Sequence, residues 1–517
     1  MDNLSNLAKK VLEYLEPDQN KWDYWTKKHE LYPVTNASCM KQFVEIIDYA
    51  IRNKEKILVA GDYDCDGILA TSIMVDGLNS LGLQTGFYIP DRIKEGYGLN
   101  TNTVELAYKK GYSILITVDN GVKAFDALQK ALSYGMKVIV TDHHQIDERV
   151  PCTLLIHPTL MEDEFAALCG AGVSYECIRA LGADTDYHLM LAGVASIGDV
   201  MEVTGQTRAL IQNGIRLLNQ SKENHLYSLA GDCDLNETSI GFQVVPKLNA
   251  IGRLSNLANV NNCVRYFLNQ DAREIYHFHS QLTRINDLRK RISSQMKDTA
   301  LKKCVPQDPI LLIRDISFHE GIIGLVAGSL CSQFQKPVIV IAQNPQGYKA
   351  SMRSPRGFDC MDFLNRFDDF CALGGHAQAA GFSLDLHAYE RFEQFVKTEG
   401  AHFSWTLEPV KTLKVTSKEL TLDAIESLDS LRPFGPGFAF PSFELEEMNI
   451  KSFYDLSNGK HRRYTLEDGL QCLYFNIPEQ DSKKSVNSIR GFIGSCQINR
   501  YRGKKQVNFI IDQIVYK

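Results

Sequence analysis

The chain has 517 residues, of which 44% are hydrophobic and 23% charged, and its formal net charge at pH 7 is −6. This composition is typical of soluble globular proteins, and the length predicts about three domains. The acidic balance argues against a protein that coats nucleic acid non-specifically, although it leaves room for local basic grooves. No apolar run is long enough to span a bilayer and the N-terminus lacks signal-peptide character, so we expect a cytoplasmic protein.

The 13 cysteines are scattered, and no two of them form a C-x-x-C pair. A disulfide framework or a thiolate zinc site would need closer or more regular spacing. We therefore expect reduced, buried thiols, with Cys331 and Cys371 as examples in apolar surroundings.

A helical segment is expected over residues 1–40, and from about residue 40 strand-like and helix-like segments alternate. The strand-like runs are 56–61, 83–90, 113–121 and 137–144, and helical periodicity is found at 68–82 and 122–135. Such alternation predicts an α/β fold with a doubly wound parallel sheet, and we assign this domain to residues 41–263.

Acidic side chains and two histidines follow the apolar runs. They are Asp62, Asp64 and Asp66 after the first run, Asp119 after the third, Asp142 with His143 and His144 after the fourth, and Asp199 after a further small-residue run at 191–198. Any one of them is explained by a polar turn, and for Asp66 that explanation is as good as a metal ligand. Their repetition at the carboxyl ends of strands, where such sheets bind ligands, favours a metal site.

The second half of the chain predicts two more domains joined by a helix. Residues 264–303 contain neither Pro nor Gly and predict one long charged helix, which we extend to 264–305 as the connecting segment. A second α/β unit is expected over 306–400, with a Gly/Ala-rich turn at 372–384. After a turn-dense boundary at 431–441, short strands predict a small β-barrel, and we assign this last domain to 401–517.

Basic and aromatic residues are mixed near the C-terminus, at Tyr501, Arg502 and Lys504, and again at 459–464. On a barrel this mixture fits single-strand binding, by phosphate pairing and base stacking. Taken alone, each cluster fits a solvated turn equally well.

Nine motifs stand in the order found in one bacterial family. They are GDYDCDG (61–67), PDRIKEGYGL (90–99), TVDNG (117–121), TDHH (141–144), IGFQVVPKLNAIGRL (240–254), HEGIIGLVAGSL (319–330), SMRS (351–354), GGHAQAAGF (374–382) and LRPFGPG (431–437). From about residue 40 to its end, the chain resembles the RecJ single-strand-specific DNA exonucleases of the DHH phosphoesterase superfamily.

The resemblance implies a DHH domain, a long connecting helix, a DHHA1 domain and a C-terminal OB-fold. It also implies a hydrolase that uses two Mn²⁺ or Mg²⁺ ions to degrade single-stranded DNA from the 5′ end to mononucleotides, in DNA repair and recombination. Single-stranded DNA is the expected substrate, and a single-strand-binding protein and a helicase are candidate partners of an otherwise monomeric enzyme.

Roles for the acids and histidines follow from the same resemblance. Asp119 would bridge the two ions, His143 would be a terminal ligand, and Asp199 would complete the second site. Asp62, Asp64 and Asp66 would supply first-motif ligands, but their spacing leaves open which two bind directly. His144 would contact the scissile phosphate or assist the leaving group, and Asp142 would orient an imidazole. Some members carry His where this chain has Ala60, which removes a possible nitrogen donor.

The resemblance also implies a set of substrate contacts. Arginine suits this task because its planar fork matches phosphate oxygens. The expected contacts to the terminal 5′ phosphate and nearby backbone are Arg92, Arg253, Ser351 and Arg353, with Asn249 and His319 beside them. Gly374 and Gly375 would allow close backbone approach to a phosphate, to which His376 can donate.

Two other functions are weighed against this one. A DHH phosphodiesterase acting on short oligonucleotides or cyclic dinucleotides would share the metal chemistry but would need neither the barrel nor PDRIKEGYGL. A non-catalytic scaffold that binds nucleic acid would be expected to have lost metal ligands, whereas this chain keeps the acids of every motif and the DHH itself.

Overall fold

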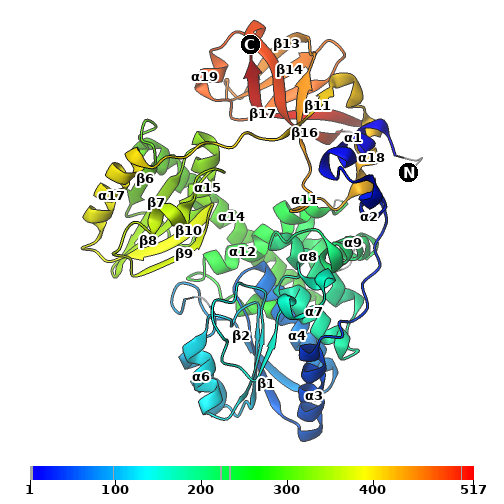
Figure 1. Ribbon diagram of the computed structural model, residues 1–517, viewed down its shortest axis with the longest axis vertical. Helices are drawn as coiled ribbons and strands as arrows, with labels where there is room; N and C mark the ends of the chain where they lie inside the picture. Colours follow the sequence, from blue (N-terminus) through cyan, green and yellow to red (C-terminus); the bar gives the residue numbers. More distant parts are fainter. Residues whose placement is uncertain (1–3, 97, 222–223, 232–233, 502–503) are drawn as a thin grey trace.

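The structure is a computed structural model that describes residues 4–96, 98–221, 224–231, 234–501 and 504–517. Three bodies make up the molecule: a doubly wound α/β unit with an attached helical layer, a second α/β unit, and a β-barrel (Figure 1). This architecture confirms the predicted fold class. None of the helices in the described part of the chain is both long and apolar enough to cross a membrane.

The first sheet is entirely parallel and positions the acids. Its strands are β1 (Lys56–Ala60), β2 (Gln84–Tyr88), β3 (Ile114–Val118), β4 (Lys137–Thr141) and β5 (Leu154–Ile156). The order is β2-β1-β3-β4-β5, so the direction of winding reverses between β1 and β3. Ligands of open α/β sheets bind at such a switch point, beyond the carboxyl ends of the strands.

Helices cover both faces of this sheet, because successive side chains along each buried strand point to opposite sides. Leu58 and Ala60 of β1 pack with α5 (Thr101–Lys109) and α6 (Phe125–Ser133). Ile57 and Val59 pack in the other core, to which α3 (Ser38–Asn53) and α4 (Cys65–Ser80) contribute.

A helical layer follows the sheet and corrects one prediction. It contains α7 (Gly170–Ala180), α8 (Asp186–Gly198), α9 (Gly205–Gln220), α10 (His225–Ala230), α11 (Glu237–Ser239), a π-helical turn (Ile240–Val244), α12 (Val245–Arg253) and α13 (Asn261–Leu268). The run before Asp199 is helix α8, whereas we expected it to resemble the strands that precede the other acids. The helix is buried all round from His188 to Ser196, and in such a segment the apolar pattern cannot distinguish helix from strand.

The predicted single long helix is wrong at its start, because the chain breaks between α13 and α14 (Ala272–Lys303). The Asp271 side chain accepts hydrogen bonds from the backbone N–H groups of Arg273 and Glu274, at 2.8 and 3.3 Å. This is an N-cap, which begins a new helix without requiring Pro or Gly. Helix α14 then runs from the helical layer to the second α/β unit.

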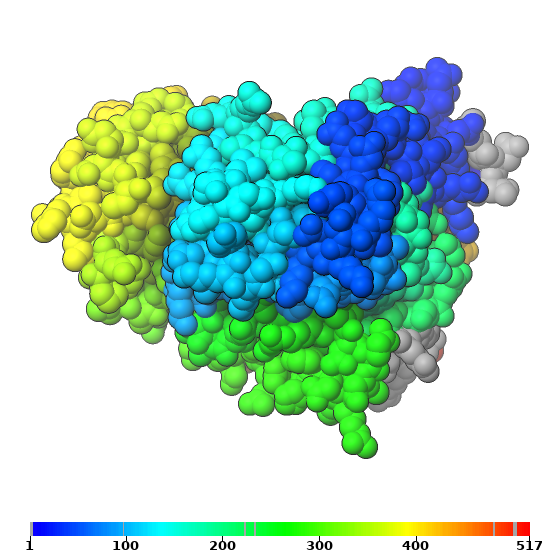
Figure 2. Space-filling view, turned by 90° about the horizontal axis from the view of Figure 1, so that it is seen from below, coloured from blue at the N-terminus to red at the C-terminus, as the bar shows by residue number. Residues whose placement is uncertain are grey.

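The second sheet is mixed, in the order β6-β7-β8-β10-β9. Its strands are β6 (Leu311–Asp315), β7 (Val338–Asn344), β8 (Gly347–Arg353), β9 (Ala372–His376) and β10 (Ala379–Leu384), with helices α15 (Ile323–Phe334) and α17 (Tyr389–His402). Figure 2 shows this unit packed beside the first α/β unit. Residues 372–384, which we expected to be a turn, form the β9–β10 hairpin; Gly and Ala are poor strand formers, so here the pairing with β8 decides.

The β-barrel contains β11 (Thr412–Thr416), β12 (Ser442–Glu446), β13 (Ile450–Leu456), β14 (His461–Leu466), β15 (Gln471–Tyr474), β16 (Ile489–Tyr501) and β17 (Lys504–Tyr516). Helices α1 (Asn6–Leu15) and α2 (Trp22–Thr26) share its core, through residues such as Leu12 and Trp25. The N-terminal helices therefore pack with the last domain of the chain (Figure 1).

The cysteines follow the prediction in part. Cys331 is buried and, like the other cysteines of the described residues, is not in a disulfide. Cys371 is exposed, which contradicts the expectation, because it directly precedes the exposed strand β9.

A candidate metal centre and a facing arginine cluster

Three neighbouring strands of the first sheet end in buried carboxylates. Asp62 follows β1, Asp119 follows β3 and Asp142 follows β4, and each is at most 3% exposed. Parallel strands bring their carboxyl ends to one edge of a sheet, so these groups are neighbours although the chain separates them by up to 80 positions, from Asp62 to Asp142. The backbone of Asp119 is left-handed, with φ of 59°, a conformation that is uncommon away from glycine.

The acids and histidines form three overlapping groups whose potential ligand atoms lie within 4.8 Å of one another. They are Asp62, Asp64 and Asp119; Asp119, His143 and His144; and Asp66, His143 and Asp199. Asp119 belongs to two groups, and His143 also belongs to two. The sequence therefore predicted residues that the fold brings together from four separate segments.

His143 is the centre of this arrangement. Its Nε2 lies 3.1 Å from Asp119 Oδ1, 3.4 Å from Asp199 Oδ2 and 3.8 Å from Asp66 Oδ2. Burial lowers its pKa, so the neutral imidazole, the form that binds metals, is favoured.

Asp142 holds the ring of His144. Asp142 Oδ1 lies 2.8 Å from His144 Nδ1 and also accepts the backbone N–H groups of both histidines. Burial opposes the charged form of His144, but the hydrogen bond to Asp142 and the charges of Asp142, Asp199 and Asp62 together outweigh it and raise the pKa of the imidazole. His157 supports the pair, because its Nε2 lies 3.0 Å from the His144 carbonyl oxygen.

Asp66 differs from the other two acids of its motif. Its two carboxylate oxygens accept the backbone N–H groups of Gly170 and Ala171, at 2.7 and 2.8 Å, which are the first two residues of α7. A helix N-terminus offers unpaired N–H groups and favours negative charge. Asp66 thus fixes α7 against the first motif, while Asp62 and Asp64 lie beside Asp119.

Close packing and a contact with α12 fix the position of the first motif, residues 61–67. A Cβ on Gly67 would lie 2.5 Å from the Asp62 carbonyl oxygen, so only glycine fits there. Asn249 was expected among the substrate contacts, but its Oδ1 accepts the backbone N–H of Cys65 at 2.7 Å. It therefore positions the loop that carries the acids.

The acids repel one another when they are ionised. Burial, followed by the charge of neighbouring carboxylates, raises the pKa of Asp62 and Asp119 well above the ordinary range. The same causes raise the pKa of Asp64, and that of Asp199 to about 8. A divalent cation among them would remove this repulsion.

The cluster fits a hard divalent cation. Asp62 Oδ1 is buried, yet no described residue donates a hydrogen bond to it. The donors are carboxylate oxygens and one imidazole, a set that suits Mn²⁺ or Mg²⁺ better than a thiolate-bound structural zinc. Ala60 ends β1 and packs with the opposite core, on the α5 and α6 side.

An arginine cluster stands beside the acids. The guanidinium of Arg92 lies 4.7 Å from the centre of the Tyr63 ring, inside the first motif. Arg253 ends α12, and burial, together with the charges of Arg92, Arg289 and Arg353, lowers its pKa to about 10. Guanidinium groups held this close together make a strong site for an anion.

Arg289 was missed by the sequence analysis. It lies on α14, where its Nε and Nη2 donate to Asn286 Oδ1 at 3.2 and 2.5 Å, and the Asn286 side chain is buried. No motif marks it, and the only available signal was an Asn three positions before an Arg in a segment that was predicted to be a long charged helix.

The second sheet supplies the other side of the cluster. Arg353 Nη1 donates to Ser351 Oγ at 2.9 Å, and Gly324 of α15 packs against both side chains. The same face continues across β10 to β9, because Arg353 pairs with Ala379, and Ala379 pairs with His376. Ala379 thus separates the partly buried Arg353 from the exposed His376 on one face of the sheet.

Gly374, Gly375 and His376 are exposed on the edge strand β9. Gly375 has φ of 153°, and a Cβ there would lie 2.4 Å from the Ala379 carbonyl oxygen. Glycine is therefore required for the hairpin itself, whatever its part in binding.

His319 lies where the two α/β units meet. Its Nε2 is 3.3 Å from Asn256 Oδ1, and its Nδ1 accepts the backbone N–H of Gly321. It lines a cavity of about 220 Å³ together with Ile93 of the first unit and Asn344 of the second. The cavity opens beside the Arg92 loop, so His319 borders the arginine cluster.

The predicted contacts on the barrel are only partly described. Backbone pairing of β16 with β17 runs to Tyr501 and Lys504, and Lys504 is exposed. Arg502 and the side chain of Tyr501 lie outside the described residues. In the second cluster, Arg462 is bound by Asp455 through two hydrogen bonds of 2.6 and 3.1 Å.

Family models match three parts of the chain. Residues 56–198 match the DHH family N-terminal domain, residues 307–399 the DHHA1 domain, and residues 412–513 the RecJ OB domain. Together these ranges include the metal cluster except Asp199, which follows the first range directly, the Arg353 face and most of the barrel.

Curated relatives match over almost the whole chain. The single-stranded-DNA-specific exonuclease RecJ of Bacillus subtilis is 29% identical over 94% of this chain, which spans 64% of that relative's length. The protein of the same name from Haemophilus influenzae is 28% identical, over 92% of this chain and 90% of its own.

Solved structures agree with the fold. RecJ from Thermus thermophilus in complex with Mn²⁺ superimposes with a TM-score of 0.85 and 25% identity, over 99% of this chain and 76% of that one. A second structure, exonuclease RecJ bound to manganese, is 30% identical and covers 72% of this chain and 97% of its own, with a TM-score of 0.64. With its DHH, DHHA1 and RecJ OB domains in this order, the chain belongs to the RecJ family.

Proposed function

We propose that this protein is a metal-dependent exonuclease that hydrolyses single-stranded DNA from its 5′ end to mononucleotides. The observation that carries the proposal is the pairing of two sites at one edge of the first sheet. A cluster of buried acids and a histidine lies beside four arginines drawn from separate segments and from both α/β units. The first site fits metal-assisted hydrolysis of a phosphodiester, and the second fits a terminal phosphate.

Two Mn²⁺ or Mg²⁺ ions, when bound, would polarise the scissile phosphate and activate water. Asp119 would serve as a ligand common to both ions, since it belongs to one group with Asp62 and Asp64 and to another with His143 and His144. Asp62 and Asp64 are the first-motif residues that we assign as direct ligands, because both oxygens of Asp66 already accept N–H groups from α7. His143 and Asp199 complete the second ion's site.

His144 is the group that we assign to proton transfer. Its Nδ1 is engaged by Asp142, which leaves Nε2 as the ring nitrogen to face the scissile phosphate. The hydrogen bond to Asp142 favours the protonated ring, and a protonated imidazole can donate to the departing oxygen.

The preference for a chain end rests on the arginine cluster, and the 5′ polarity is taken from the family. Arg92, Arg253, Arg289 and Arg353 would hold the charge of a terminal 5′ phosphate, and Ser351 orients Arg353. An internal phosphodiester carries less charge than a terminal phosphate, so this site favours chain ends. His319 and His376 border the same surface and would contact the next phosphates.

The remaining assignments rest on the family. The barrel would guide the single strand, with Tyr501, Arg502 and Lys504 at its β16–β17 end, and the DNA would be degraded in repair and recombination in the cytoplasm. A single-strand-binding protein and a helicase are the partners that this role requires.

The proposal is tested with single-stranded DNA labelled at the 5′ or the 3′ end, in Mn²⁺, with the Asp119→Ala variant as control. We expect release of labelled mononucleotide from the 5′ label at once and from the 3′ label only late, and loss of both in the variant.

Two outcomes would replace the proposal. Turnover of short oligonucleotides without attack on long DNA would indicate a small-substrate phosphodiesterase. Binding of single-stranded DNA with no cleavage in any divalent metal would indicate a scaffold.

A further inference from the structure

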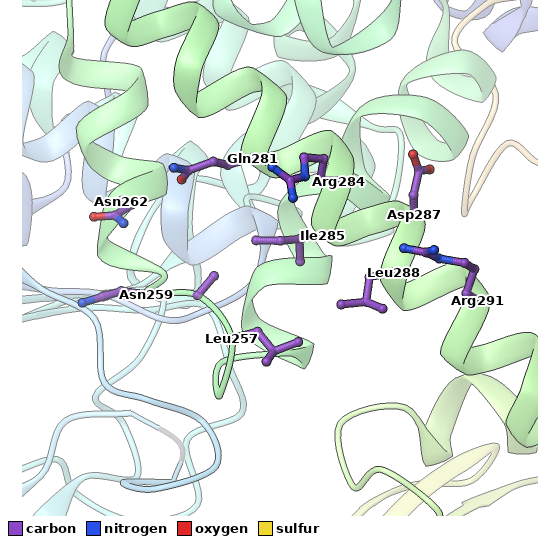
Figure 3. Close-up of a pocket in the computed structure, with 10 residues that line it drawn as sticks. Leu257, Asn259, Asn262, Gln281, Arg284, Ile285, Asp287, Leu288 and Arg291 are labelled. Atoms are coloured by element: carbon purple, nitrogen blue, oxygen red, sulfur yellow. The ribbon is translucent and has the colours of Figure 1, made fainter.

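A second cavity of the described chain lies outside the metal centre, on the flank of α14. It is a groove of about 800 Å³ between α14 and the segment 257–262, which joins α12 to α13 (Figure 3). We call it the α14 groove. Its volume is in the range, about 300–1,000 Å³, that small ligands occupy.

The polar lining of the α14 groove is rich in hydrogen-bond donors. Arg284 and Arg291 stand seven residues apart on one side of α14, so both face the same opening, about 10 Å apart along the axis. Within the described parts of the chain, neither guanidinium has a hydrogen bond or an ion pair, whereas Asp287 has Lys290 at 3.6 Å. The two positive charges are thus available to an external anion.

Two amide side chains add further donors. Asn259 Oδ1 accepts from the backbone N–H and the Nδ2 of Asn261, both at 2.9 Å, and Asn262 Oδ1 accepts from Arg265 Nη1 at 2.7 Å. Their acceptor oxygens are therefore occupied. No described residue accepts a hydrogen bond from the amide nitrogens of Asn259 or Asn262, so the amides present N–H groups.

The other part of the lining is aliphatic. Ile285 and Leu288 of α14 face Leu257, whose side chain is 55% exposed (Figure 3). A purely anionic ligand such as inorganic phosphate would leave this surface in water. A ligand that joins phosphate to a flat, weakly polar ring would cover it.

We propose that the α14 groove binds a nucleoside phosphate. The guanidinium groups of Arg284 and Arg291 take the phosphate oxygens, and the amides of Asn259 and Asn262 donate to the same anion. The base lies on Leu257, Ile285 and Leu288, where the Gln281 side chain, also part of the lining, can contact its edge.

The groove is placed to influence the metal centre, because its walls are shared with the arginine cluster. Two residues before Leu257, Ser255 Oγ donates to Asp91 Oδ1 at 2.8 Å and so holds the Arg92 loop. Asn256 contacts His319, and on α14 Arg289 directly follows Leu288. A ligand in the groove therefore contacts α14 and the segment that follows α12. Other residues of these two elements would hold the terminal phosphate or support the residues that hold it.

Binding is measured by equilibrium dialysis of the full chain in EDTA with ATP, dAMP or inorganic phosphate as probe. Three double variants are compared: Arg284→Ala/Arg291→Ala in the groove, Arg253→Ala/Arg353→Ala in the cleft, and Arg273→Ala/Lys302→Ala, which removes the same charge from exposed positions at the two ends of α14. We expect ATP or dAMP to bind the wild type more tightly than phosphate does. The groove changes, made in the cleft variant so that only one phosphate site remains, should weaken this binding at least about tenfold, and the surface changes made in the same background should alter it less than about twofold.

The assay separates the groove from the cleft. Failure of ATP and dAMP to bind the wild type at millimolar concentration would overturn the proposal. So would binding that is lost in the cleft variant and kept in the groove variant. A single-stranded oligonucleotide that displaces ATP and depends equally on Arg284 and Arg291 would assign the groove to a nucleic-acid strand instead. None of these results depends on whether the chain cleaves DNA.

Discussion

At the scale of single residues, the metal centre depends on glycines as much as on acids. Gly170 begins α7 directly against Asp119, and a Cβ at this position would lie 2.4 Å from the Asp119 Cβ and 2.7 Å from its Oδ1. Asp119 is already in a left-handed conformation, so it has little freedom to move aside. Gly170, which lies 51 residues after Asp119, is therefore as necessary to this site as the TVDNG motif, although no motif marks it.

Gly170→Ala is expected to displace the Asp119 carboxylate and to lower the cleavage rate by about a hundredfold or more, since a shift of about 1 Å has such an effect in active sites. Mn²⁺ affinity, measured by isothermal titration calorimetry, should fall with it. Gly172→Ala is the matched control, because its Cβ would meet the Leu168 side chain and no metal-binding residue. Equal activity of the two variants would contradict the close contact.

Stability should depend on pH through the same acids. Asp199 has its pKa raised from 3.8 to about 8 by burial and by the charges of Asp66 and Asp64. Between these pH values the folded, metal-free chain holds a proton that the unfolded chain has released. Its free energy of unfolding therefore falls as the pH rises through this window.

Calorimetric melting in EDTA should accordingly show a Tm that declines as the pH rises toward 8. Saturating Mn²⁺ should remove the decline, because it binds the ionised acids and stabilises the folded chain. Asp199→Asn should weaken the decline in EDTA. A Tm that rises over the same interval without metal would refute the assigned direction.

At the scale of elements, α14 joins the two α/β units and contributes to the phosphate site. Arg289 lies near Arg253, and its guanidinium donates two hydrogen bonds to Asn286. The helix thereby sets the distance between the acids of the first unit and the Ser351–Arg353 strand of the second. The charged composition of this helix gave no sign, in the sequence, of the buried polar contact between Asn286 and Arg289.

Arg289→Ala should weaken the binding of a 5′-phosphorylated oligonucleotide by about tenfold, the value of one charge-assisted hydrogen bond, and affect a 5′-hydroxyl oligonucleotide much less. Fluorescence anisotropy with both oligonucleotides measures the difference. Lys290→Ala removes the neighbouring charge from an exposed position and should leave both affinities unchanged. A loss that is the same for both ends would assign Arg289 to general strand binding.

At the scale of the whole molecule, one buried arginine joins the chain's beginning to its last domain. Arg208 of α9 is fully buried and donates to the carbonyl oxygens of Trp25, Leu431 and Pro433, each at 3.0 Å. Its guanidinium lies 5.0 Å from the Trp25 ring, which stacks on Phe438 at 4.0 Å. The helical layer, the N-terminal helices and the entry to the barrel therefore meet at one side chain.

Arg208→Met should lower the free energy of unfolding by about 3 kcal/mol or more, because it leaves buried carbonyl oxygens without donors. Urea denaturation measures the change, and limited proteolysis of the linker at 403–411 should become faster as the barrel loosens. Arg216→Met, on the exposed side of the same helix, is the control and should change stability by less than about 0.5 kcal/mol. Similar losses of stability in both variants would show that the hydrogen bonds of Arg208 do not join these segments.

The local sequence pattern was enough to predict part of the fold and of the site. Short buried strands followed by Asp62, Asp119 and Asp142 predicted a parallel sheet with acids at one edge, because strand periodicity is a local property and any parallel sheet brings the carboxyl ends of its strands to the same edge. The motifs identified the family, and they contain most of the residues that the fold brings together, including His143 and Arg253.

Only the tertiary structure decided the rest. The helical nature of the run before Asp199 and the strand nature of 372–384 were settled by burial and pairing, which override weak local preference. Arg289, Gly170 and the α14 groove depend on contacts between segments that are distant in the chain. The sequence by itself determined which chemical groups this protein possesses; the packing of its domains decided which of them meet, because proximity across the chain is a property of the folded core and not of any local stretch.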